Sequence, residues 1–455
     1  MKKLVGILMM AATVAAAQSP VDSRQQAVVF RSVNVIPMDA ERVLENQDVV
    51  ARDGKILAMG PSGKVAYEKS AFVVEARGKY LIPGLAEMHA HIPPNDNVAA
   101  QKEVLLLFAL NGVTTVRGML GHPTHLTLRD QVNRGEVLGP HIYTSGPSFN
   151  GLSVKTPEYG EKMVRDQKQL GYDFLKLHPG LTLANFNAIV KTANEVGITY
   201  GGHVSSAVGV WRAIDANYST IDHLDGFIEG MVPGIEAMTD QEIGFFGLFV
   251  GKKADLSQLP RLVEGLREHR VWVVPTQALA ERWIAADKSP EELRAAPEMK
   301  YMDPKTLDAW TENKKRQMAV PGYNAEEVGK YIELRRRIIK ACNDGGVGLL
   351  LGSDAPQVFN VPGYSVHHEL RYLVQAGLTP YQALKTGTVN VAAFYNQSAT
   401  SGTVAEGKVS NLVLLNGNPL KDIASTQSIE GVMLGSQWLQ RAYLDAELKR
   451  LEKGK

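Results

Sequence analysis

The sequence predicts an α/β protein: a (β/α)8 TIM barrel with an accessory β-sandwich domain built from both ends of the chain. The chain has 455 residues, of which 44% are hydrophobic, so it can form one large barrel and a smaller second domain. In the middle of the chain, short apolar segments alternate with amphipathic ones, as in successive βα units. The segments before and after this region are β-rich and lack helical periodicity.

The first residues predict an export signal, at residues 1–17. Lys2 and Lys3 precede the apolar run 4–17, and residues 15–17 are three alanines that suit a signal peptidase. We therefore expect an exported protein, periplasmic or secreted, with a bacterial-type signal peptide. The alternative is an apolar helix that stays attached. The run is short for a membrane span, and no later segment is long and apolar enough for one.

Residues 25–80 and 401–445 predict the two parts of the accessory domain. Strands or hairpins are expected at 28–35, 49–58, 72–74, 411–419 and 429–439. The first hairpin turns at Asp53-Gly54, a pair that favours a two-residue hairpin turn. Neither part can bury a core alone, so we expect them to form one discontinuous β-sandwich.

Residues 81–400 predict the barrel. Eight short strands, the number that closes such a barrel, are expected at 85–91, 115–117, 142–145, 174–177, 199–204, 220–223, 271–274 and 348–352. Helices between them include 161–170, 183–196 and 208–216. The insertions 225–267 and 278–345 are longer than ordinary connections. Such insertions typically lie over the barrel mouth as lids or substrate walls, although an oligomer contact would also explain them.

Histidine, lysine and aspartate recur where the predicted strands end. His89 and His91 lie two residues apart on the first strand, so their side chains point the same way. The ends of strands four, five, six and eight carry, in order, Lys176, His203, His223 and Asp354. Because barrel strands end at one rim, we expect all six residues to converge there. Imidazole and carboxylate ligands suit Zn²⁺ or a similar divalent ion.

Each of these residues has a commoner structural explanation when taken alone. A single histidine near a strand end is more often a core or surface residue than a ligand. A buried lysine cation is costly, and an aspartate after Gly-Ser usually caps a helix or forms a turn. Their joint occurrence at matching strand ends favours a metal site.

In these segments the sequence resembles the amidohydrolase superfamily. The matching segments are 82–91 (IPGLAEMHAH), 112–117 (GVTTVR), Lys176, His203, 222–223 (DH), 352–354 (GSD) and 402–413 (GTVAEGKVSNLV). The resemblance covers nearly all of the expected mature chain. It is closest to the imidazolonepropionase-like branch that includes prolidase-like Xaa-dipeptidases.

The resemblance implies a centre of two divalent metal ions, with Zn²⁺ expected. The first ion would be held by His89, His91 and Asp354, and the second by His203 and His223. Lys176 would be carboxylated and would bridge both ions. Asp354 would also be catalytic, taking a proton from the metal-bridging hydroxide and passing it to the leaving amine.

The reaction that we expect is hydrolysis of an amide or peptide bond in a dipeptide or N-acyl amino acid. Ser206 stands three residues after His203, where deaminases of the superfamily typically carry glutamate. This favours hydrolysis of an amide, lactam or ester over deamination. Two alternatives stay open: a mononuclear hydrolase of a cyclic amide (lactam) or ester (lactone) with unmodified Lys176, and a non-catalytic exported binding protein.

Three further residues are candidate substrate contacts. His178 shares the strand face of Lys176, Tyr143 lies near the expected mouth, and His367 opens a helix after strand eight. The net charge of +1 gives no indication of binding to nucleic acid or to a membrane. We therefore expect a small-molecule or dipeptide substrate, and a homo-oligomer.

Overall fold

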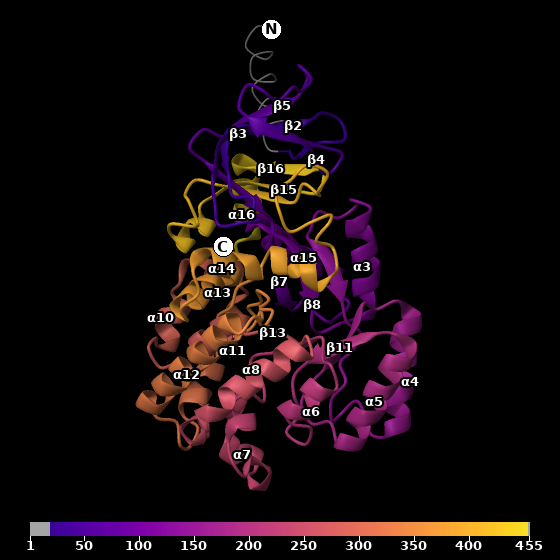
Figure 1. The fold of residues 1–455 in the computed structure, drawn as a ribbon, viewed down its shortest axis with the longest axis vertical. Coiled ribbons are helices and arrows are strands. Elements are labelled where there is room, and N and C mark those ends of the chain that lie inside the picture. Colours follow the sequence, from indigo (N-terminus) through magenta and orange to yellow (C-terminus); the bar gives the residue numbers. More distant parts are fainter. Residues whose placement is uncertain (1–18, 454–455) are drawn as a thin grey trace.

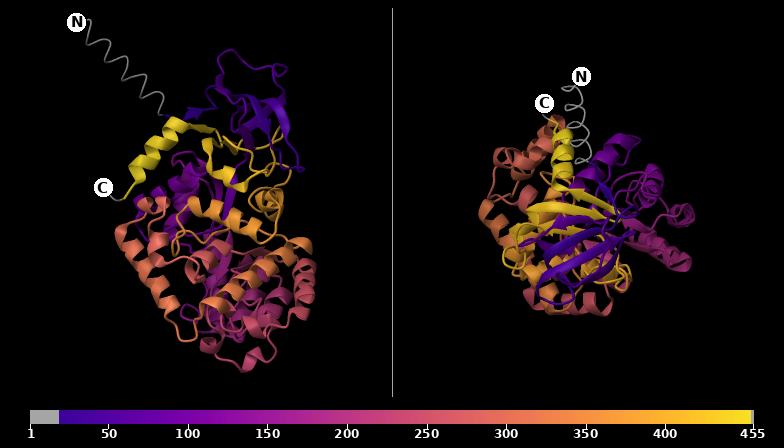
Figure 2. Two further views of the ribbon diagram at one scale, coloured as in Figure 1. Left: turned by 90° about the vertical axis from the view of Figure 1, so that its left-hand side faces the viewer. Right: turned by 90° about the horizontal axis from the view of Figure 1, so that it is seen from above.

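The computed structural model describes residues 19–453, so the expected export signal lies outside the described residues. A β-rich part, built from the first and last segments of the chain, lies at one end of a larger α/β part (Figure 1). The indigo and yellow ribbons of the two chain ends run side by side in both further views (Figure 2). Among the described residues, no helix has the length and apolarity needed to cross a membrane.

Both ends of the chain contribute strands to one nine-stranded sheet. Its order is β1-β16-β15-β14-β6-β2-β3-β4, and β5 pairs with β2 beside this path. The strands are β1 (Val21–Asp22), β2 (Val28–Val35), β3 (Leu44–Arg52), β4 (Lys55–Pro61), β5 (Phe72–Glu75), β6 (Tyr80–Pro83), β14 (Leu412–Leu415), β15 (Ile429–Leu434) and β16 (Gln437–Gln440). The two chain ends meet where β14 pairs with β6 and β16 with β1, both antiparallel.

Local turns explain where these strands begin and end. The β3–β4 hairpin turns at Asp53 and Gly54, both with positive φ, as the sequence predicts. Residues 429–439, expected as one strand, form the hairpin of β15 and β16, because the chain reverses at Gly435 with a φ of 57°. Helix α16 (Arg441–Leu451) follows this hairpin and packs against α2 (Val98–Leu110).

The expected β-sandwich is instead a single sheet that curls over its own core. Four strand spacings separate β2 from β16, which would put them about 19 Å apart in a flat sheet. The rings of Phe30 on β2 and Trp438 on β16 nevertheless lie 4.9 Å apart. The sheet stays continuous because β6 pairs with both β14 and β2.

The α/β part contains two parallel sheets, with the orders β7-β8-β9 and β10-β11-β12-β13. Their strands are β7 (Leu85–Ala90), β8 (Val113–Gly118), β9 (His141–Thr144), β10 (Phe174–Leu177), β11 (Thr199–Gly202), β12 (Thr220–Asp222) and β13 (Trp272–Val274). Seven of the eight predicted barrel strands are therefore present. The eighth, expected at 348–352, forms single bridges instead of a ladder.

Isolated parallel bridges connect the two sheets. Residues 145–149 bridge to β10, and residues 349–355 bridge to β13 on one side and to β7 on the other. The segments thus follow one another in the order expected for a barrel, but their ladders do not form one closed sheet. Just beyond the predicted strand 348–352, Asp354 has a φ of 64° and leaves the extended conformation.

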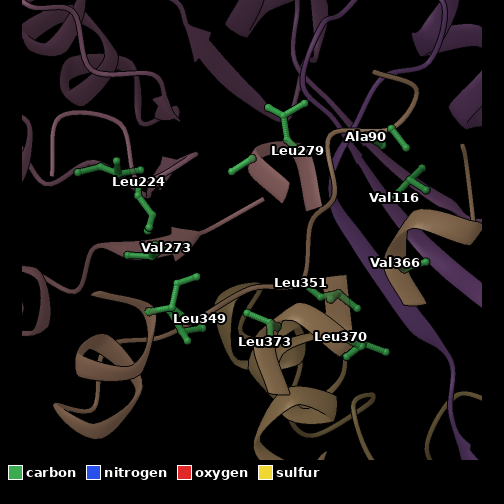
Figure 3. Packing of buried hydrophobic residues seen from close by; sticks show 14 of the residues in the cluster. Ala90, Val116, Leu224, Val273, Leu279, Leu349, Leu351, Val366, Leu370 and Leu373 are labelled. Atoms are coloured by element: carbon green, nitrogen blue, oxygen red, sulfur yellow. The ribbon is translucent and has the colours of Figure 1, made fainter. Parts of the chain in front are cut away.

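Helices surround these sheets. Those between the strands or after them are α2, α3 (Pro123–Asn133), α4 (Pro157–Leu170), α5 (Leu183–Val196), α6 (Val210–Asp215), α8 (Leu259–Glu268), α13 (Tyr364–Gln375), α14 (Pro380–Thr386) and α15 (Val389–Phe394). The insertions add α7 (Asp240–Ile243), α9 (Gln277–Leu279), α10 (Pro290–Arg294), α11 (Pro304–Met318) and α12 (Ala325–Asp344). Leu351 of the eighth segment packs near Leu370 and Leu373 of α13 in the main core (Figure 3).

The curled sheet predicts a large effect of Trp438→Ala. Trp438 is 1% exposed and joins strands from both chain ends, so its removal leaves a cavity in their shared core. The free energy of unfolding should fall by about 3–5 kcal/mol, measured by chemical denaturation. Leu57→Ala is the control, because Leu57 lies on β4 of the same sheet and is 63% exposed. Equal effects of both variants would contradict the shared core.

Candidate metal centre

The strand ends bring His89, His91 and Asp354 into contact. His89 lies on β7, His91 follows that strand, and Asp354 comes from the eighth segment. His91 Nε2 lies 2.5 Å from Asp354 Oδ1, and His89 Nε2 lies 3.4 Å from the same oxygen. One ligand atom from each residue lies within 4.8 Å of the other two. The three side chains therefore form a possible metal site.

The other three predicted ligands adjoin this group. The His223 ring lies 4.4 Å from the His89 ring and 4.5 Å from the His203 ring, centroid to centroid. Lys176 Nζ lies 3.5 Å from Asp222 Oδ2, and the same oxygen is 3.0 Å from His89 Nδ1. All six predicted residues thus belong to one cluster, which we call the strand-end cluster.

Three strand ends carry unusual backbone conformations. His223, Thr276 and Asp354 have φ values of 64°, 44° and 64°, although none of them is glycine. Such conformations cost of order 1–3 kcal/mol each and concentrate at functional sites. They turn the chain immediately after the strand, where a side chain can point across the cluster.

Burial favours the neutral form of His89 and His203. Burial, followed by the nearby Lys176 charge, holds the pKa of His89 and of His203 well below its usual range. Burial also lowers the pKa of the Lys176 amine, against the opposing effect of the Asp222 and Asp354 charges. Neutral imidazole nitrogens have the free lone pair that a metal ion requires.

Several buried polar atoms of the cluster have no hydrogen-bond partner among the described residues. They are His89 Nδ1, Lys176 Nζ and both carboxylate oxygens of Asp222. These groups contact one another, at 3.0 and 3.5 Å from Asp222 Oδ2, without a hydrogen bond of good geometry. Buried polar atoms without well-formed hydrogen bonds are costly, so a group bound among them would stabilise the cluster. Four imidazoles with carboxylates are a donor set that suits divalent metal ions.

Comparison with known proteins identifies the family. The sequence profile of the amidohydrolase family matches residues 80–439. This chain belongs to the amidohydrolase family. It is therefore a hydrolase that acts on carbon–nitrogen bonds, in agreement with the resemblance noted from the sequence.

Three relatives show how far the similarity of this amidohydrolase extends. Imidazolonepropionase of Geobacillus sp. (strain WCH70) is 23% identical over 430 residues, which cover 86% of this chain and 90% of the relative. The structure of a putative prolidase from Bifidobacterium longum has a TM-score of 0.66 at 22% identity, covering 94% and 99% of the two chains. Bottromycin amidohydrolase has a TM-score of 0.70 at 21% identity, covering 93% and 89%.

Oxygen atoms outside the predicted set orient two histidines of the amidohydrolase. His203 Nδ1 lies 3.0 Å from Asp225 Oδ2, and His223 Nδ1 lies 2.8 Å from Thr276 Oγ1. These hydrogen bonds leave Nε2 of each ring as the nitrogen that could face a metal ion. Thr276 follows β13, so a search for polar residues just after the seventh predicted strand would have found it. Asp225 lies in an irregular turn that no sequence pattern marks.

Both insertions reach the cluster. The Phe246 ring, from the insertion 225–267, stacks against the His223 ring at 5.2 Å and the His203 ring at 6.1 Å. Arg335, on α12 in the insertion 278–345, donates hydrogen bonds to the backbone oxygens of His223 and Pro275, at 2.8 and 3.0 Å. The insertions therefore lie over the strand ends, as a lid or wall would.

The three candidate substrate contacts have different positions. The His178 ring stacks 4.9 Å from the His203 ring, so it adjoins the cluster. The Tyr143 ring stacks instead on Tyr395 at 3.7 Å, in a cavity lined by none of the predicted ligands.

His367 also faces away from the cluster. Its ring nitrogens lie 3.0 Å from Thr426 Oγ1 and 3.1 Å from the backbone oxygen of Asn111. Sequence alone placed Tyr143 and His367 on the right strand or helix. It did not reveal which neighbours their side chains meet.

Arg335→Ala should destabilise the cluster. Arg335 is 1% exposed, and its loss leaves the backbone oxygens of His223 and Pro275 without this donor. We expect the free energy of unfolding to fall by about 3 kcal/mol or more, measured by chemical denaturation. Arg337→Ala, on the exposed face of the same helix, is the control and should change it by about 0.5 kcal/mol or less. If Arg335→Ala left the free energy of unfolding unchanged, Arg335 would have no such stabilising role.

Proposed function

We propose that this amidohydrolase is a metal-dependent enzyme that cleaves the amide or peptide bond of a dipeptide or N-acyl amino acid. The observation that carries the proposal is the strand-end cluster, in which ligand atoms of His89, His91 and Asp354 lie within 4.8 Å of one another. The similarity to a prolidase supports a dipeptide as substrate. We further propose that the two parallel sheets and residues 349–355 together form the (β/α)8 barrel, which the likeness to these relatives supports.

The resemblance to the amidohydrolase superfamily suggests the metal ligands, and the closeness of these side chains in the cluster supports it. His89, His91 and Asp354 would hold one divalent ion, and His203 and His223 a second, with Zn²⁺ favoured by the imidazole-rich set. Lys176 would be carboxylated on Nζ and bridge the two ions. This modification would turn a fully buried cation into an anionic ligand for the metal ions. When bound, the ions would activate a water molecule and polarise the scissile carbonyl.

The residues of the chain would position groups and move the proton. Asp354 is close enough to two histidines to act at the reacting centre, and its carboxylate would take a proton from the attacking water. The same carboxylate would return that proton to the nitrogen of the leaving amine. Asp225 and Thr276 would hold the His203 and His223 rings in orientation.

A second candidate is a mononuclear hydrolase of a cyclic amide (lactam) or an ester such as a lactone. It is favoured by the 3.5 Å distance between Lys176 Nζ and Asp222 Oδ2, which suits an unmodified ammonium group. It is also favoured by the similarity to imidazolonepropionase over most of both chains. Membership in an enzyme family argues against the third alternative, a non-catalytic binding protein.

We also propose export to the periplasm or out of the cell. The support is the charged start at Lys2 and Lys3, the short apolar run 4–17 and the small residues at its end. Self-association into a homo-oligomer stays a prediction.

Metal content separates the two candidate reactions. For the binuclear centre, we expect about two ions per chain by elemental analysis of the zinc-loaded protein, against about one for the mononuclear centre. Lys176→Ala should then lower the content to about one or less, because the bridging ligand is lost. An unchanged content in Lys176→Ala would exclude the bridge, and protein without any bound metal would contradict both candidates.

Asp354→Asn should abolish turnover while the protein stays folded. The amide cannot accept the proton at neutral pH, so kcat should fall by roughly 10²- to 10⁴-fold. The measurement is steady-state hydrolysis of a dipeptide and N-acyl amino acid library, with metal content determined in parallel. Asp96→Asn is the control, because its side chain is 95% exposed. Full activity of Asp354→Asn would remove Asp354 from the mechanism.

A further inference from the structure

The side chains of the strand-end cluster are largely covered by other parts of the chain. The side chains of Lys176, His223 and His203 are 0%, 2% and 14% exposed. An amide must bring its carbonyl carbon and oxygen next to these groups. Access of a substrate to these groups therefore depends on the segments that cover them.

Aromatic side chains form a continuous path from the cluster to the surface. Phe246 stacks on His223 and His203, and the Phe245 ring lies 3.9 Å from the Phe246 ring. The Trp283 ring in turn lies 5.0 Å from the Phe245 ring. Phe245 is 38% exposed, whereas Phe246 is buried. The covering segment belongs to the part of the insertion near α7, at the end of the molecule opposite the nine-stranded sheet (Figure 1).

The backbone of this segment suits a hinge. Phe246 has a φ of 53° and a ψ of 38°, a left-handed conformation that side chains with a Cβ disfavour. Gly244 and Gly247 flank the two phenylalanines with φ values of 73° and 74°. Glycine adopts such angles readily, and equally readily leaves them. Phe246 thus occupies an unfavourable conformation between two flexible points, so an interaction elsewhere must hold it in place.

That interaction is a hydrogen bond from α12. The Tyr331 hydroxyl donates to the backbone oxygen of Phe246 at 3.0 Å. Arg335 Nη1 lies 3.5 Å from the Tyr331 hydroxyl and donates at 2.8 Å to the backbone oxygen of His223. The same helix therefore secures both the covering segment and the strand end beneath it.

A cavity next to this hydrogen bond offers room for the displaced ring. It measures about 460 Å³ and lies between residues 248–256 and α12. Its lining includes Leu248, Phe249, Val328 and Tyr331. An apolar lining suits a phenyl ring that leaves the cluster.

We propose that residues 244–247, the Phe246 gate, close the metal centre and open to admit substrate, with the Tyr331 hydroxyl as their latch. In the open state the Phe246 ring moves into the adjacent cavity. This proposal rests on the proposed function, because the Phe246 gate would control access to the metal centre. The Tyr331 hydrogen bond, however, can be tested without measuring catalysis.

Hydrogen–deuterium exchange tests the latch. Tyr331→Phe keeps the ring and removes only the hydroxyl, so exchange in a peptide spanning 244–250 should rise by roughly 2- to 10-fold, the effect of one lost hydrogen bond. Tyr323→Phe is the matched control, because the Tyr323 hydroxyl donates to the backbone oxygen of Ile284 at 2.9 Å in the same insertion. Equal exchange at 244–250 in both variants would overturn the latch.

Metal removal tests access. Zinc-loaded protein is mixed with a chelator, and the rate of zinc release is followed by absorbance. Tyr331→Phe and Phe246→Ala should speed release, Tyr323→Phe should not, and Ala254→Phe should slow it by filling the cavity. Faster exchange at 244–250 without faster release would overturn the gate. A chain that binds no zinc would instead contradict the proposed function, and the exchange experiment would still decide the latch.

Discussion

The burial of Lys176 beside Asp222 is the constraint on which the rest of the site depends. Both side chains are fully buried and lie 3.5 Å apart, at the base of a group of histidine rings. An amine and a carboxylate removed from water are expensive unless their environment compensates them. The two groups compensate each other in part, but among the described residues they make no hydrogen bond of good geometry, so a bound metal ion would stabilise them further. An energetic argument therefore supports the proposed function alongside the residue types.

The positions of the ligands depend on strained strand ends that distant segments support. His223 and Asp354 adopt left-handed conformations that a strand end alone would not favour. Arg335, more than a hundred residues from His223, donates a hydrogen bond to its backbone oxygen. The insertions thus stabilise the site as well as cover it. This explains why segments without a repeating pattern make close contacts with the cluster.

Local sequence patterns predicted most of the elements. Turn chemistry at Asp53-Gly54 between two apolar runs identified the β3–β4 hairpin, and seven of the eight predicted parallel strands were found from short apolar runs. The patterns could not tell a β-sandwich from one curled sheet, because that depends on the pairing of β6 with β2 and β14. They also missed the hairpin of β15 and β16, since its turn falls within a largely apolar stretch.

The sequence by itself determined which residues stand at the strand ends, because strand alternation and the common rim of parallel strands are properties of the backbone. It therefore predicted that His89, His203 and Asp354 converge. Only the tertiary structure decided that Tyr143 meets Tyr395 and that Phe246 covers the cluster. Those contacts join side chains across irregular segments, where no periodicity fixes a direction. Their geometry follows from how the whole chain packs.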